Sequence, residues 1–259
     1  MNRNGSGERP GVCPALRGAL AFLSRLPVGA GERAWDAFRT TPFAFPLAGY
    51  VLGGLLALAL LGVDALSSGP TVAFVLVAGV YLLTGIAHAD GVADLGDAAA
   101  AHGRGERRAA LADVAVGAGG TLALTFVVAA LTLAGLALAG LPRGALLLVI
   151  AAEVSAKLGM AALACLGTAT HEGLGAAFTA PNNPRALAGA VLVALPAAAL
   201  TWPRPAAALA LLAGTVAALA VGWWARSALG GVSGDAFGAA NELARVAALH
   251  AGVIAWTPS

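Results

Sequence analysis

The sequence predicts an all-α integral membrane protein, a polytopic bundle of about seven transmembrane helices preceded by an N-terminal interfacial helix. Of its 259 residues, 59% are hydrophobic and only 11% are charged, and the mean hydropathy is +0.84. Soluble domains average about 45–50% apolar and about 25% charged residues, so the composition departs from theirs in both respects. The apolar residues also fall into long runs separated by short polar segments, which is the pattern of repeated membrane crossings.

The composition also indicates which classes of binding partner the chain can have. Its formal net charge is +2 and its longest basic run is the pair Arg107-Arg108, so a nucleic-acid partner is not expected. The lipid bilayer is the partner that the apolar runs predict. Cys13 and Cys165 stand alone in the sequence and imply neither a disulfide framework nor a cysteine metal site. The sequence does not determine the oligomeric state, and a homo-oligomer is one of the states that it allows.

The chain begins with a polar, Gly-rich stretch, residues 1–14, which lacks the apolar core of a cleaved signal peptide. We expect a disordered cytoplasmic tail there and a single polytopic membrane domain over residues 15–259. Residues 15–28 are apolar but too short to cross a bilayer, and arginines interrupt them. This pattern predicts an interfacial helix that is ended by Pro27.

Seven apolar segments follow, and most approach the roughly 20 residues needed to cross a bilayer. Pro46 lies near the start of the first, where a helix tolerates the missing N–H. Trp223 and Trp224 near the end of the sixth are typical interface anchors. The fifth is short and rich in alanine. The spans are predicted at residues 43–63, 70–89, 117–140, 144–166, 186–200, 206–226 and 236–256.

The arginines are distributed unequally between the two sides that seven crossings define. Eleven precede the first span or lie in loops on that same side, while only Arg143 and Arg204 lie on the other side. Because cytoplasmic loops are enriched in Lys and Arg, we expect a multi-pass protein of the cell membrane with a cytoplasmic N-terminus. The same parity places the loops after the second and sixth spans in the cytoplasm.

The polar stretch that follows the second span holds three aspartates, Asp90, Asp94 and Asp97. On a helix their i, i+4, i+7 spacing puts all three carboxylates on one face. Clustered carboxylates repel one another unless a cation lies among them, and oxygen-only ligands suit a hard divalent ion such as Mg²⁺. The sequence therefore predicts a Mg²⁺ site at the membrane edge, able to hold a pyrophosphate while a phosphoryl bond breaks. The alternative is a solvated helix end with three acids on its wet face.

The loop after the sixth span carries a second polar cluster. Asp235, Asn241 and Glu242 follow glycines, among them Gly230 and Gly234, that permit close approach of the backbone to a ligand. Because both clusters are expected on one side of the membrane, we expect them to meet. Asp97 or Asp235 is the expected general base toward an attacking hydroxyl. The alternative for Asp235 is a structural acid in the first turn of the last helix.

Other polar residues are less specific. His88, close before the first aspartate, is either a packing residue or part of the site. Glu153 and Lys157 form an i, i+4 pair inside the fourth span, which is either a neutralised structural pair or the lining of a polar cavity. His250 in the last span is expected to pack between helices.

Five motifs resemble, in the same order, those of the cobalamin synthase family, the adenosylcobinamide-GDP ribazoletransferases. The longest are His-x-Asp-Gly-x-Ala-Asp-x-x-Asp and Leu-Gly-Gly-x-Thr/Ser-Gly-Asp-x-x-Gly-Ala-x-x-Glu-Leu, and both are complete here. Each motif alone is weak, but the five extend over most of the chain and together make a specific match. They lie at Phe22 to Val28, Phe45 to Gly49, His88 to Asp97, Glu172 to Gly175 and Leu229 to Leu243.

The resemblance implies a membrane transferase of cobalamin (vitamin B12) biosynthesis. Such an enzyme joins adenosylcobinamide-GDP to α-ribazole or its 5′-phosphate, releases GMP, and gives adenosylcobalamin or its 5′-phosphate. It implies Mg²⁺ as the cofactor, with Asp90, Asp94 and Asp97 as the matching ligands. The residues that it implies for substrate binding are Arg25, His88, Glu172, Asn241 and Glu242.

The sequence departs from the family pattern at two arginines. The family's Asp-Ser-Arg-x-Gly is here Asp113-Val114-Ala115-Val116-Gly117, and its Ser-Arg in the fourth span is Ser155-Ala156. Ala115 and Ala156 thus stand where the family has arginines, which bears on phosphate contacts more than on the reaction class. Lys157, next to Ala156, is one candidate for the missing charge.

Two other classes of membrane protein remain open. A CDP-alcohol phosphatidyltransferase also uses spaced aspartates after Asp-Gly, but it typically has Ala-Arg two residues later, where this chain has Ala93-Asp94. An ion-coupled transporter would use Glu153, Lys157 and His250 as intramembrane relays. Transporters usually show internal repeats and acids near the midplane of the bilayer, whereas most acids here lie at one edge and no repeat is visible.

Overall fold

A computed structural model describes residues 11–29, 31–65 and 68–256, and within these ranges the chain forms helices and no strand. The prediction of an all-α bundle is therefore confirmed. Residues 1–10 of the predicted tail lie outside the described residues. The first helix, α1 (Val12–Leu23), begins two residues before the predicted end of that tail and ends at Ser24, before Pro27.

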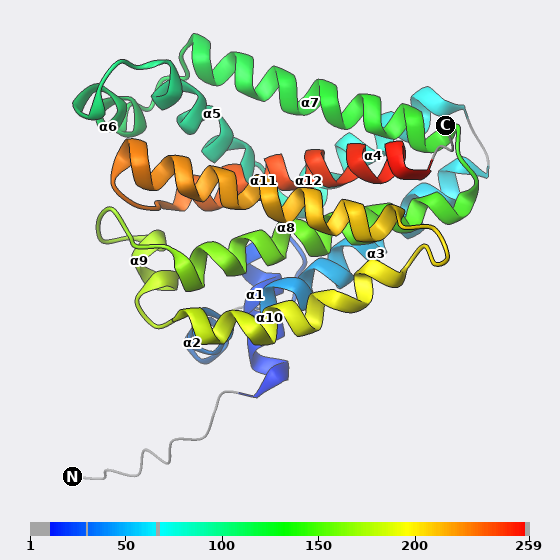
Figure 1. Ribbon diagram of the computed structural model, residues 1–259, viewed down its shortest axis with the longest axis horizontal. Coiled ribbons are helices and arrows are strands. Elements are labelled where there is room, and N and C mark those ends of the chain that lie inside the picture. The colour runs from blue at the N-terminus through cyan, green and yellow to red at the C-terminus, as the bar shows by residue number, and fades with distance from the viewer. Residues whose placement is uncertain (1–10, 30, 66–67, 257–259) are drawn as a thin grey trace.

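The longer helices lie side by side along one axis and alternate in direction, while α1 crosses them (Figure 1). Short helices and turns join them at the two ends of the bundle. The remaining α-helices are α2 (Glu32–Arg39), α3 (Ala44–Asp64), α4 (Gly69–Thr84), α5 (Ala87–Ala100), α6 (Arg104–Ala112), α7 (Ala118–Ala139), α8 (Leu147–Leu166), α9 (Leu174–Thr179), α10 (Leu187–Ala194), α11 (Ala206–Leu229) and α12 (Gly234–Trp256). Three 3₁₀ turns, η1 (Arg143–Leu146), η2 (Pro184–Ala186) and η3 (Leu195–Ala199), precede α8 and flank α10.

The structure supports a membrane protein but does not confirm seven crossings. Four helical segments are long and apolar enough to cross a membrane: α3, α7, η1 with α8, and α11. The helices α4 and α5 are long and apolar enough for a crossing only when taken together, and the angle between them is 99°. The apolar segment with α10 is shorter than 18 residues, and α12, although 23 residues long, carries three charged side chains.

The bend between α4 and α5 ends the predicted second span early. Gly85 has a positive φ of 73°, a conformation that glycine adopts without steric cost, and it ends α4 at Thr84 rather than near residue 89. Because α5 then leaves at 99°, α4 and α5 do not form one straight crossing, and we assign α5 to the polar end of the bundle rather than to the spanning segments.

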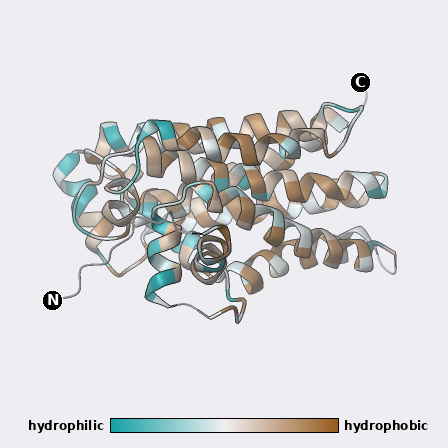
Figure 2. Cartoon of the chain, turned by 90° about the horizontal axis from the view of Figure 1, so that it is seen from below, coloured by the Kyte–Doolittle hydropathy of each residue, from teal (hydrophilic) through white to brown (hydrophobic). Residues whose placement is uncertain are grey.

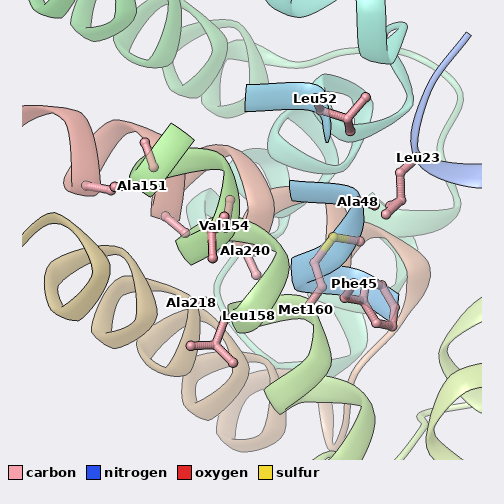
Figure 3. Packing of buried hydrophobic residues seen from close by; sticks show 14 of the residues in the cluster. Leu23, Phe45, Ala48, Leu52, Ala151, Val154, Leu158, Met160, Ala218 and Ala240 are labelled. Carbon is pink, nitrogen blue, oxygen red and sulfur yellow. The ribbon is translucent and has the colours of Figure 1, made fainter. Parts of the chain in front are cut away.

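The core is built around α8, whose apolar window is 89% buried, compared with 28% for α7 and α11. Small residues bring the helices close. A Cβ on Gly49 or Gly53 of α3 would lie within 2.8 Å of the α8 backbone, so these glycines form the helix contact that their spacing permits. Figure 3 shows the buried cluster formed by α3, α8, α11 and α12.

Hydrophilic residues gather toward one end of the bundle, where α6 and α9 lie (Figure 2). The helix α5 and the start of α12 lie at this end, and with them the four aspartates that the sequence singles out. We call it the acid end. The helices α4, α8 and α11 end there, whereas α3, α7, α10 and α12 begin there.

Candidate active site at the acid end

The three aspartates that follow the second predicted span lie on one helix, as predicted. Asp90, Asp94 and Asp97 belong to α5, and their spacing aligns the carboxylates along one face. The opposite face is apolar, with Val92 and Leu95 buried. The helix is therefore amphipathic, with its acids directed away from the packed interior.

The other predicted cluster meets this helix through two glycines. A Cβ on Gly91 of α5 would lie 2.6 Å from the carbonyl oxygen of Asp235, and a Cβ on Gly238 of α12 would lie 3.1 Å from Cα of His88. Glycine at Gly91 is required for this approach of the backbones, and at Gly238 a larger residue would force a small displacement. The expectation that the two acidic stretches meet is confirmed, whereas their action as one site stays a prediction.

Partial burial and nearby negative charge raise the pKa of Asp94 to about 6. The largest cause is partial burial of the carboxyl group, followed by repulsion from Asp235, Asp90 and Asp97. A carboxylate that is held among three others favours a bound cation, because a cation removes the repulsion. The electrostatics of the site therefore suit a hard metal ion.

Asp97 differs from the other two aspartates of α5 in its contacts. Its Oδ2 accepts a hydrogen bond of 2.7 Å from the N–H of Gly117, and its Oδ1 accepts one of 2.9 Å from the N–H of Gly120. These are among the free N–H groups at the start of α7, so Asp97 caps that helix from outside. Both oxygens are thus already engaged, although each keeps a further lone pair.

Among the residues that the structure describes, no three His, Cys, Asp or Glu side chains are gathered into a metal-binding group. The donor set still fits Mg²⁺ in its chemistry, because Asp90 and Asp94 accept no hydrogen bond from a described group and one oxygen of Asp235 is also free. The assignment of Asp90, Asp94 and Asp97 as metal ligands stays a prediction.

The segment before Asp235 is tied to the loop that carries Glu172. Val232 pairs with Ala169 in a short parallel bridge, and its N–H donates to the carbonyl oxygen of Thr168 at 2.8 Å. Ser233 donates its hydroxyl to one Asp235 oxygen at 3.1 Å. Glu172 itself is exposed, so its carboxylate remains free at the rim of the site.

Arg25 lies at the bend from which α5 departs. Its backbone N–H donates to the carbonyl oxygen of Leu83 at 2.8 Å. Its side-chain Cδ would be 3.6 Å from a Cβ placed on Gly85. The side chain is exposed and forms no ion pair with any carboxylate of the described ranges. It is therefore a free cation beside the acidic helix, which suits a phosphate group.

His88, Asn241 and Glu242 are placed differently from the exposed residues. All three are buried, with Asn241 and Glu242 at 0% exposure. The Asn241 amide nitrogen lies 3.1 Å from both His88 Nδ1 and Glu242 Oε1. These side chains thus link the first turn of α5 to α12 from inside the bundle, and their assignment to substrate binding stays untested.

The same network continues into the membrane-spanning core. Arg245 of α12 bridges Glu242, with Nη1 at 2.5 Å from Oε2, and Glu153 of α8. Lys157 completes it with Nζ at 2.7 Å from Glu153 Oε2. The i, i+4 pair seen in the sequence is therefore half of a neutral group of two acids and two cations. The sequence analysis missed Arg245, which could have been found as a cation three residues after Glu242 in an apolar segment.

A model of one protein family matches the chain over residues 15–253, which includes every residue of the site described above. The description of that family is cobalamin-5-phosphate synthase. The chain belongs to this family.

Members of the cobalamin-5-phosphate synthase family with curated names are similar along nearly the whole chain. An adenosylcobinamide-GDP ribazoletransferase of Halorubrum lacusprofundi is 52% identical over 258 residues, covering 95% of this chain and 99% of its own length. The enzymes of the same name from Haloquadratum walsbyi and Methanocella arvoryzae are 44% and 34% identical over similar lengths. No solved structure matches.

The two positions where the family pattern has arginines differ in their surroundings. Ala156 is fully buried in α8, beside the Glu153–Lys157 pair. Ala115 lies exposed in the loop before α7, where its N–H donates to Asp113 at 3.0 Å. In this synthase the buried position therefore has two cations nearby, Lys157 and Arg245, whereas nothing described replaces the charge at Ala115.

Replacing Gly91 by alanine is expected to weaken the contact between α5 and α12. The added methyl group would lie 2.6 Å from the carbonyl oxygen of Asp235, so the two helices must move apart. We expect a lower midpoint of thermal unfolding, with a loss of about 1–3 kcal/mol. Gly54→Ala in α3 is the matched control, because a Cβ there meets nothing within 4 Å. Equal midpoints of thermal unfolding for Gly91→Ala and Gly54→Ala would contradict a close contact between α5 and α12.

Proposed function

We propose that this chain transfers the cobinamide phosphate of adenosylcobinamide-GDP to α-ribazole or its 5′-phosphate and releases GMP. The curated relatives bear the name of that activity over nearly the whole chain. The observation on which the proposal rests is the meeting of α5 and α12 at Gly91, which brings Asp235 to the three aspartates of α5. Acids at one end of an apolar bundle suit a pyrophosphate substrate that reaches the site from water.

Mg²⁺ is the proposed cofactor, held by Asp90, Asp94 and the remaining lone pairs of Asp97. When bound, it would neutralise the pyrophosphate and the charge that develops on the departing GMP. The repulsion that raises the pKa of Asp94 supports this assignment, because removal of the ion leaves that repulsion uncompensated.

Asp235 is the better candidate for the general base. Both oxygens of Asp97 are already engaged by the N–H groups of Gly117 and Gly120, which leaves Asp97 less available to a substrate hydroxyl. Asp235 receives only the Ser233 hydroxyl on one oxygen. In the proposed step the ribazole hydroxyl attacks the phosphorus on the cobinamide side, its proton passes to Asp235, and the bond to GMP breaks.

The exposed residues Arg25 and Glu172 are proposed to contact the substrates. Arg25 offers a free guanidinium to phosphate, and Glu172 offers an acceptor to a hydroxyl or amide group. For the buried His88, Asn241 and Glu242 we favour a positioning role, because their contacts hold α5 against α12.

The experiment is GMP release by the purified protein in detergent or liposomes, supplied with adenosylcobinamide-GDP and α-ribazole 5′-phosphate. Release is expected with Mg²⁺ and is expected to stop when the ion is chelated with EDTA and to return when it is restored. Release that needs no divalent ion would overturn the metal assignment. No release from folded protein under any condition would overturn the transferase proposal.

We further propose that the acid end faces the cytoplasm, as the arginine distribution predicts. Cys13 is exposed on α1, whereas Cys165 is buried in α8. A membrane-impermeant maleimide is therefore expected to label Cys13 only after cells are permeabilised. With Cys13→Ser as background, Arg204→Cys at the opposite end should be labelled in intact cells. Labelling of Cys13 in intact cells would reverse the orientation.

A further inference from the structure

A groove of about 800 Å³ runs along the side of the bundle between α7 and α11, with α5 and α12 as its floor. Figure 1 shows α12 in the space between those two helices. The lining is apolar, and the indole nitrogen of Trp224 is the one polar side-chain atom in it. Leu243 of α12 is 38% exposed here, although its neighbours Glu242 and Ala244 are buried. The central helix that carries Asp235 is therefore open to the membrane along this groove.

The groove extends over about two thirds of the thickness of one lipid leaflet. Its walls extend from Ala123 to Ala130 on α7 and from Trp224 to Ala217 on α11, between the acid end and the middle of each helix. At 1.5 Å per residue this is about 10 Å. Half of a hydrocarbon core of about 30 Å is about 15 Å. An acyl chain that enters from the acid end would therefore fill the groove along most of its length.

Cations stand at the acid end of the same groove. Arg107 donates from Nε to the carbonyl oxygen of Ala101 at 3.3 Å, just beyond the groove residue Ala99 of α5. Arg104 and Arg108 each donate one N–H to carbonyl oxygens at the end of α11, those of Ser227 and Leu229, at 3.1 Å. The helix α6 thus bridges the two helices whose ends form the mouth of the groove.

The three arginines keep donors free for an anion. None of them forms an ion pair within the part of the chain that the structure describes, and Glu106, the acid of α6, accepts instead from the N–H of His102. Each guanidinium has five N–H groups, of which one is used here. The backbone contacts hold the arginines in place, so a phosphate at the mouth would meet a prearranged positive group.

We propose that the groove holds an acyl chain of an anionic phospholipid, with its phosphate bound by Arg104, Arg107 and Arg108. Charge complementarity at the mouth, an apolar wall and a length that lies within one leaflet favour this occupant over a second copy of the chain. The lipid would contact Val92 and Leu95, on the face of α5 opposite its carboxylates. It would thereby support the helix that carries the acids.

The experiment measures quenching of Trp224 fluorescence by phospholipids brominated on their acyl chains, in vesicles. The chain has five tryptophans, so one protein keeps only Trp224 and a second keeps only Trp223, which is 72% exposed and outside this groove. From the quenching of Trp224 we expect phosphatidylglycerol to bind about fivefold or more tightly than phosphatidylcholine. One arginine near an anionic lipid is worth about 1 kcal/mol. The readout does not depend on enzymatic activity.

Arg107→Gln is expected to lower the preference at Trp224, and the triple Arg104→Gln, Arg107→Gln, Arg108→Gln variant to abolish it. Arg226→Gln, at the same end of α11 but beside Trp223 in a separate pocket, is the matched control and should leave it unchanged. Ala220→Phe, at an exposed groove position, should reduce quenching by both lipids. Equal quenching by the two lipids, or a preference that survives the triple variant, would overturn the proposal. No quenching by either lipid would overturn it in favour of a second copy covering the groove.

Discussion

Asp94→Asn is expected to abolish GMP release while leaving the protein folded. Asp94 lies among the three other acids of the site, and partial burial together with their charges raises its pKa to about 6. Asp94 is a proposed Mg²⁺ ligand whose loss should remove several kcal/mol of charge stabilisation, so we expect a fall of about 10³-fold in the rate at saturating Mg²⁺. The measurement is GMP release beside the midpoint of thermal unfolding in the absence of Mg²⁺.

Stability separates this variant from a structural defect. A raised pKa means that the ionised carboxylate destabilises the fold above about pH 6, so the neutral amide should preserve or raise the midpoint at pH 7.5. Asp97→Asn should lower it, because an amide can accept only one of the two N–H bonds from Gly117 and Gly120. Asp64→Asn at the opposite end should change neither quantity. Full activity of Asp94→Asn would remove Asp94 from the site.

Glu153→Gln is expected to cost about 3–5 kcal/mol of stability. Glu153 is 1% exposed and is paired with both Lys157 and Arg245. Its replacement leaves one excess positive charge among side chains that are at most 1% exposed. The measurement is the free energy of unfolding in mixed detergent micelles.

The double variant Glu153→Met, Lys157→Met tests the cause. It removes one acid and one cation and leaves the Glu242–Arg245 pair, so the interior stays neutral. We expect it to be more stable than Glu153→Gln. The exposed Glu32→Gln on α2 is the control for loss of an acid and should change stability by less than about 0.5 kcal/mol. If the double variant is no more stable to unfolding than Glu153→Gln, then packing, rather than charge balance, determines the loss of stability.

The sequence was sufficient to predict what depends on neighbouring residues along the chain. The long helices α3, α7, α8 and α11 lie within a few residues of the predicted spans, because an apolar run of that length has few other stable forms in a membrane. The shared face of Asp90, Asp94 and Asp97 follows from 3.6 residues per turn. The meeting of Asp235 with these acids was predicted from the parity of the crossings alone.

Contacts between helices were decided only by the tertiary structure. The spacing of the aspartates cannot reveal that Asp97 caps α7, since its donors, Gly117 and Gly120, lie on another helix. The pair Glu153–Lys157 likewise gains Arg245 only because α8 packs against α12. Seven crossings were predicted from hydropathy, but Gly85 turns α5 away by 99°. A helix repeat determines which side chains share a face, whereas close glycine contacts such as Gly91 on Asp235 determine what that face meets.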